Sequence, residues 1–103
     1  MGRAAGMEGI KIEKINDSQR KSMGIPDTPR RVGHWSVWEC EPSVFDWHYS
    51  QQETAYIYEG RAKVKMGVQE IEIKVGDLVT FPKGLSCRWE VISKIRKVYT
   101  FEE

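Results

Sequence analysis

The stretch 76–89 constrains the fold more than any other part of the chain. It begins with a Gly-Asp turn, and residues 78–81 (Leu-Val-Thr-Phe) have the β-branched and aromatic character of a buried strand. Pro82 ends this strand, because proline has no N–H to donate to the ladder. Gly84 permits a second sharp turn, and the next strand is expected to start near Cys87. A strand held between two such turns fixes the position of Cys87, which becomes a candidate ligand or nucleophile.

Most of the remaining chain has the same β pattern. The clearest hairpin joins 62–66 to 71–75, where apolar and charged residues alternate on either side of Gly67. The sequence predicts about nine short strands, at 9–15, 34–40, 43–49, 54–58, 62–66, 71–75, 78–81, 87–92 and 97–101. Short strands with Gly or Pro between them are typical of an all-β sandwich or barrel, and closure of the sheet removes exposed edges.

One short helix is expected, close to the N-terminus. Asn16 supplies N-cap chemistry for a turn or two that ends at Gly24. Residues 26–31 contain two prolines and are expected to cross to the first long strand without regular structure.

Segment 9–15 is predicted to be an edge strand, since apolar and charged residues alternate along it. Its apolar residues Ile10, Ile12 and Ile15 would present an uncovered face. Pairing with a second copy of the chain would cover both the edge and this face, so the sequence predicts a homodimer.

The composition indicates one domain over 1–103, with a flexible segment at 1–8 and a barrel over about 35–101. Sixteen basic and fifteen acidic residues leave no basic excess, which argues against a nucleic-acid partner. No apolar run approaches the roughly 20 residues that span a bilayer, so no membrane partner is expected. The two cysteines form neither a disulfide framework nor a zinc-finger pair, and a cytoplasmic location is expected.

Two sets of residues have spacings that resemble the two motifs of the cupin family. The first set is Asp46-x-His48-x4-Glu53-x6-Gly60, and the second is Gly76-x5-Pro82-x-Gly84-x2-Cys87. In cupins the second motif usually ends in a metal-binding histidine, where this chain has Cys87. The runs 47–49 and 87–89 are similar to those of small single-domain cupins related to ureidoglycine aminohydrolase and the ethanolamine-utilisation cupin. This resemblance implies a jelly-roll β-barrel with a pocket in its mouth.

Two alignments of the first motif remain open, because cupins have either three or four residues before the glutamate. The four-residue form points Asp46 and His48 into the barrel, whereas the three-residue form points Trp47 and Tyr49 inward. Since successive side chains in a strand alternate between faces, only one of these pairs can line the pocket. The same alternation applies to the other strands. If Glu53 points inward, Tyr56 and Tyr58 point to the opposite face. If Cys87 points inward, Trp89 also points inward and Arg88 points outward.

The choice decides which chemistry the pocket can support. With the first pair inside, a divalent transition metal (Mn, Fe, Zn or Ni) would be held by imidazole, carboxylate and thiolate groups from His48, Glu53, Cys87 and Asp46. With the second pair inside, the pocket is an aromatic cavity that lacks metal ligands, with Glu53 and Cys87 as its polar points.

The resemblance implies a small polar metabolite as ligand, such as a ureide, an amino acid or a carboxylate. In an enzyme of the aminohydrolase type, Glu53 and Cys87 would be the catalytic candidates, with Glu53 as general base or metal ligand. Trp47, Tyr49 and Trp89 would then shape the cavity. The alternative is a non-catalytic module that binds a small molecule and has lost the metal site.

Overall fold

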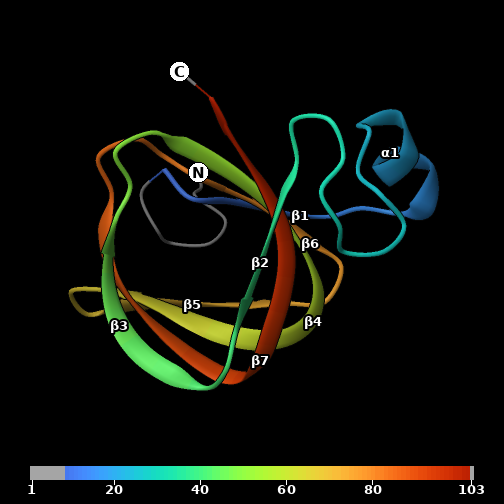
Figure 1. Ribbon diagram of the computed structural model, residues 1–103. Helices are drawn as coiled ribbons and strands as arrows, with labels where there is room; N and C mark the ends of the chain where they lie inside the picture. Colours follow the sequence, from blue (N-terminus) through green and yellow to red (C-terminus); the bar gives the residue numbers. More distant parts are fainter. Residues whose placement is uncertain (1–8, 103) are drawn as a thin grey trace.

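The computed structural model describes residues 9–102, and shows one short helix beside a curled, strongly twisted sheet (Figure 1). The predicted flexibility of residues 1–8 lies outside this described part. The elements, in chain order, are β1 (Lys11–Lys14), α1 (Asp17–Ser22), β2 (Ser36–Cys40), β3 (Ser43–His48), β4 (Gln52–Met66), β5 (Gln69–Lys74), β6 (Asp77–Phe81) and β7 (Ser86–Glu102). Within residues 9–102 no helix is long and apolar enough to cross a membrane.

All strand pairs are antiparallel, and they form one sheet with the order β1-β6-β4-β7-β2. Strand β3 also pairs with β7, and β5 pairs with β4, so the two longest strands carry the others. The sheet curls around a single interior, as the open circular outline in Figure 1 shows. The all-β jelly-roll prediction with one short helix is confirmed.

Strand β4 corrects one prediction, because the sequence indicated two strands separated by a break near Gly60. The strand instead continues through Gly60 as an irregularity, with shifts of register against β7 between Ile57 and Ala62. Gly60 has φ of 85°, and a Cβ at this position would lie 2.0 Å from the carbonyl oxygen of Lys94. Glycine is therefore needed here so that the two backbones can approach, and it bends β4 without ending it. The two strands predicted at 87–92 and 97–101 likewise merge into β7.

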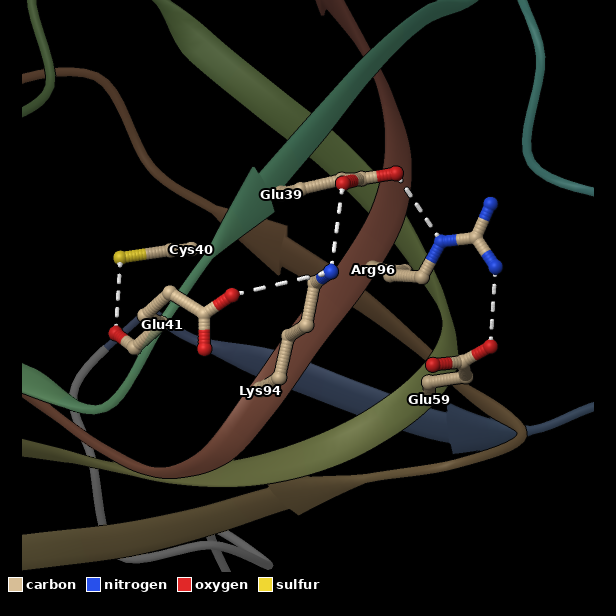
Figure 2. A network of polar contacts seen from close by, with 6 residues as sticks. All are labelled: Glu39, Cys40, Glu41, Glu59, Lys94 and Arg96. Carbon is tan, nitrogen blue, oxygen red and sulfur yellow. Dashed lines mark hydrogen bonds and ion pairs between the residues drawn. The ribbon is translucent and has the colours of Figure 1, made fainter.

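A network of ion pairs lies on the outer surface beside this irregularity (Figure 2). Arg96 on β7 contacts Glu39 at 3.0 Å and Glu59 at 2.9 Å, and so connects β2, β7 and β4. Lys94 contacts Glu39 at 3.6 Å and Glu41 at 3.7 Å. Each exposed pair of this kind contributes about 0–1 kcal/mol. The network therefore contributes little to the free energy of unfolding, although its pairs connect β2, β7 and β4 in the observed register.

The helix forms where the sequence predicted it. The Asn16 side chain accepts a hydrogen bond from the backbone N–H of Gln19 at 2.8 Å, and the Gln19 side chain accepts one from the Asn16 backbone at 2.9 Å. This reciprocal capping satisfies two N–H groups that have no partner within the helix. Gly24, with φ of 76°, follows the helix in the left-handed conformation that turns the chain away.

Two apolar clusters lie on opposite faces of the sheet. The larger one fills the barrel interior and includes Ile57, Val79, Phe81 and Trp89. The smaller one packs outside the barrel, and consists of Ile25, Trp35, Leu78 and Val98 with Tyr56 and Tyr58 against them. The Tyr58 hydroxyl donates to the carbonyl of Pro26, which holds the crossing segment over this outer cluster.

Strand β1 lies at one end of the strand order, as predicted for an edge. The isoleucines of segment 9–15 contact the rest of the chain, however: Ile10 is buried in the barrel interior, Ile12 is partly buried against it, and Ile15 is partly buried against the outer cluster. The apolar face that motivated the homodimer prediction is therefore partly covered by the chain itself. Pairing of two chains through the β1 edge stays a prediction.

Candidate functional site

A cavity of about 130 Å³ opens into the barrel between β2, β3 and β7. Its walls are mostly aromatic, and a carboxylate and an ammonium group are its charged points. The lining residues are Trp38, Phe45, Trp47, Tyr49, Glu53, Trp89, Lys97, Tyr99 and Phe101. Trp47 and Phe101 are about half exposed, whereas Trp89 is buried, so the cavity has an open and a closed end.

The charged points form a buried ion pair. Lys97 Nζ on β7 lies 2.9 Å from Glu53 Oε2 on β4, and their side chains are only 7% and 5% exposed. Removing either ion from water costs several kcal/mol unless an opposite charge lies beside it. The opposite charge of each side chain therefore explains why the other can be buried.

Aromatic rings surround the ammonium of Lys97. Its Nζ lies 4.7 Å from the ring centroid of Trp38, 5.0 Å from Trp89 and 5.7 Å from Tyr99, distances at which the ring faces attract a cation. An ammonium has three N–H donors, and within residues 9–102 its hydrogen-bond acceptor is Glu53. The other donors of Lys97 are therefore available to a ligand in the cavity.

Tyr49 adds a neutral polar group to the wall. The indole N–H of Trp89 donates to the Tyr49 hydroxyl at 3.2 Å, and the Tyr49 ring stacks on Phe81 with 4.7 Å between centroids. Burial raises the pKa of Tyr49 well above its usual range, and the nearby carboxylate of Glu53 raises it further. The hydroxyl accepts from Trp89 and keeps its own proton, so it can donate one hydrogen bond.

Strand β3 settles which pair of side chains enters the barrel. Trp47 and Tyr49 line the cavity, while Asp46 and His48 are exposed on the other face. Asp46 accepts from Arg88 Nε at 2.8 Å, an interaction that lowers the pKa of this carboxyl group. His48 Nδ1 lies 2.7 Å from Ser86 Oγ. The three-residue alignment is therefore the one that the structure adopts.

The predicted metal-ligand set is not brought to one point, because Glu53 lines the aromatic cavity whereas Asp46, His48 and Cys87 line a separate, open hollow at the surface. Asp46 and His48 lie outside, where they contact β7, and Glu53 is already bound to the ammonium of Lys97. In the described part of the chain, no group of three or more His, Cys, Asp or Glu side chains is arranged to hold a metal ion. The arrangement of these donors thus does not favour a divalent metal, and metal binding through this set stays a prediction.

Cys87 is a buried member of the barrel core and does not line the aromatic cavity. As predicted, Trp89 shares its face and Arg88 points outward. Burial raises the pKa of the Cys87 thiol from 9.0 to about 11, with a smaller contribution from the charge of Asp46. A neutral thiol is a poor nucleophile and a poor metal ligand. The catalytic role of Cys87 stays a prediction.

Sequence reasoning missed Lys97 and four aromatic residues of the cavity. These aromatic residues are Trp38, Phe45, Tyr99 and Phe101. The available signal was the alternation along 95–101, which places Ile95, Lys97, Tyr99 and Phe101 on one face. It was ambiguous because Val98, on the opposite face, is equally buried in the outer cluster.

Comparison with known proteins agrees with this architecture. A sequence model of the EutQ-like cupin domain matches residues 28–99. A DUF861 family protein from Thermotoga maritima is 41% identical, with a TM-score of 0.79, over 90% of this chain and 99% of that protein. No curated protein matches the chain.

More distant structures share the fold alone. The EutQ protein of Clostridium difficile is 22% identical, with a TM-score of 0.61, over 65% of this chain and 53% of that protein. A putative ethanolamine utilization protein Q from Salmonella typhimurium is 19% identical, with a TM-score of 0.59, over 97% of this chain and 76% of that protein. With the family match covering most of the barrel, the chain belongs to the EutQ-like cupin domain family.

Proposed function

We propose that this barrel is a metal-independent binding module for a small polar metabolite. The observation that carries the proposal is the buried Glu53–Lys97 pair, which lies at the wall of an open aromatic cavity. Of the two functions that the sequence left open, an aminohydrolase-like enzyme and a non-catalytic binding module, this proposal is the second. The aminohydrolase-like alternative depended on a metal set, and its two catalytic candidates, Glu53 and Cys87, do not line one cavity.

The charge of the site indicates the charge of its ligand. Lys97 and Glu53 neutralise each other, so a ligand with net charge would leave one buried charge without a partner. A neutral or zwitterionic ligand avoids this cost. Its acceptor oxygen would receive the remaining N–H groups of Lys97, and its donor group would contact the carboxylate of Glu53. Amides and ureides have this pattern as neutral molecules, and amino acids have it as zwitterions.

The size of the cavity limits the ligand further. One water molecule occupies about 30 Å³ of liquid, so a cavity of about 130 Å³ accepts a compact molecule about the size of four waters. The flat aromatic walls favour a planar group such as an amide or urea. Larger ligands would have to extend past Trp47 and Phe101 at the open end.

Isothermal titration calorimetry with four matched probes tests the proposal. Acetamide is neutral, glycine is zwitterionic, acetate is an anion and acetamidinium is a cation, and all four are of similar size. We expect acetamide and glycine to bind with one site per chain and to bind more tightly than the two ions. Equal or tighter binding of acetate would contradict the charge argument.

Variants then locate the binding. Lys97→Met removes a charge-assisted hydrogen bond of about 1.5–3 kcal/mol, so we expect the dissociation constant of acetamide to rise by at least about tenfold. Lys83→Met is the matched control, because Lys83 is exposed and lies outside the cavity. Unchanged acetamide binding by the Lys97→Met protein would place the ligand elsewhere. Tyr49→Phe provides a second variant that keeps the ion pair.

A further inference from the structure

Lys97 is the buried lysine of residues 9–102, and it lies at the wall of the open cavity. The other lysines whose ion pairs are defined are 38–69% exposed. An amine in a cavity lined with aromatic rings is a candidate nucleophile towards carbonyl compounds, because the walls limit the water that hydrolyses the product.

We propose that Lys97 forms a covalent imine with small neutral aldehydes or ketones, and that Glu53 transfers the protons this reaction requires. The inference rests on the proposed function, since the carbonyl compound would occupy the same cavity as the polar ligand. It extends that function from reversible binding to carbonyl chemistry.

The geometry supplies the first step. The ammonium of Lys97 and the carboxylate of Glu53 are 2.9 Å apart, so a proton passes directly between them. The transfer yields a neutral amine and a neutral carboxylic acid. The lone pair of the amine can then attack the carbonyl carbon of a bound aldehyde.

The remaining steps balance without another reactant. A C–N bond forms as the carbonyl π bond breaks, and a proton moves from nitrogen to the oxygen to give a neutral carbinolamine. The protonated Glu53 gives its proton to this hydroxyl group, which leaves as water while the C=N bond forms. The product is a protonated imine on Lys97 beside the carboxylate of Glu53, and the total charge is unchanged.

The groups around Lys97 stabilise this product as they stabilise the starting ammonium. The protonated imine is a cation at the same place, so the rings of Trp38, Trp89 and Tyr99 attract it as they attract the ammonium. The carboxylate of Glu53 remains its counter-ion. A ligand that brought its own negative charge would instead compete with Glu53, which is why the class is neutral carbonyl compounds.

Reductive trapping tests the inference on the whole chain. The protein is incubated at neutral pH with acetaldehyde and cyanoborohydride, and the alkylated lysines are identified and timed by peptide mass spectrometry. We expect Lys97 to react at least about tenfold faster than Lys83, and acetamide to protect Lys97 without protecting Lys83. These two measurements use the wild-type protein, so they do not depend on a variant that folds.

Variants add a second criterion. Glu53→Gln removes the proton carrier, and general acid–base catalysis contributes at least about 100-fold, so trapping at Lys97 is expected to slow by about that factor while Lys83 is unaffected. Trapping at Lys97 that is no faster than at Lys83 overturns the inference. If acetamide still binds in that case, the proposed binding function stands; if acetamide binding is also absent, both proposals fail.

Discussion

Breaking the Glu53–Lys97 pair from either side should destabilise the protein by unequal amounts. The side chains are almost fully buried, so removal of one partner leaves an uncompensated charge and costs about 3–5 kcal/mol. Lys97→Met strands the carboxylate of Glu53, and the full cost is expected. Glu53→Leu strands the ammonium, but the rings of Trp38 and Trp89 still attract it, which offsets about 1–2 kcal/mol.

The double variant Glu53→Leu/Lys97→Met removes both charges and fills the space with apolar atoms. Replacement of a buried ion pair by apolar side chains of similar volume is often neutral or stabilising. We therefore expect the double variant to lie within about 1 kcal/mol of the wild type, far from the sum of the single changes.

Urea denaturation followed by tryptophan fluorescence gives the free energy of unfolding of all four proteins. A domain of this size is stable by about 5–15 kcal/mol, so both single variants should remain folded enough to measure. Additive single effects, with a coupling below about 0.5 kcal/mol, would show that the two charges are separately hydrated. That result would refute the buried pair and the site built on it.

Gly60→Ala should lower the free energy of unfolding in urea by about 2–5 kcal/mol, because the strain of a left-handed alanine adds to a clash with the backbone of Lys94. Gly67→Ala is the control: its new Cβ would meet nothing within 4 Å, so it should cost only about 1–2 kcal/mol. Equal costs would contradict the close approach of β4 and β7. Cys87 should resist alkylation by iodoacetamide at pH 8, because the pKa of its thiol is raised to about 11 in the folded state. The stability that this raised pKa contributes is complete below pH 9 and is lost as pH rises through about 11. Urea denaturation of the wild type and Cys87→Ala at increasing alkaline pH measures this loss. His48→Ala should leave acetamide affinity unchanged in calorimetry, because this side chain lies outside the barrel; a large loss would restore it to the site.

Much of the fold was predictable because local chemistry and tertiary structure agree. The cap at Asn16, the hairpin around Gly67 and the strand before Pro82 each depend on residues that are close in sequence. The break predicted at Gly60 was wrong because glycine has two roles in a strand. It ends some strands, but here it permits a close contact with Lys94, a residue far away in the sequence.

The candidate site was predictable only in part. Trp47, Tyr49, Glu53 and Trp89 were identified and line the cavity, because alternation along a strand is a local property. The choice between the two faces of β3 required the pairing of this strand with β7, which no local pattern provides. Lys97 was missed because a lysine in a strand normally points to solvent, and only its distant partner explains its burial.

Binding in the aromatic cavity is tested most directly by an NMR titration of the four tryptophan indole N–H groups with acetamide. Trp38, Trp47 and Trp89 line the cavity, whereas Trp35 packs in the outer cluster and serves as an internal reference. We expect saturable shifts of the three cavity indoles, largest for Trp38 and Trp89 beside Lys97, with Trp35 unchanged. Shifts of Trp35 alone, or no saturable shift of the cavity indoles, would contradict the assignment of the aromatic cavity as the binding site.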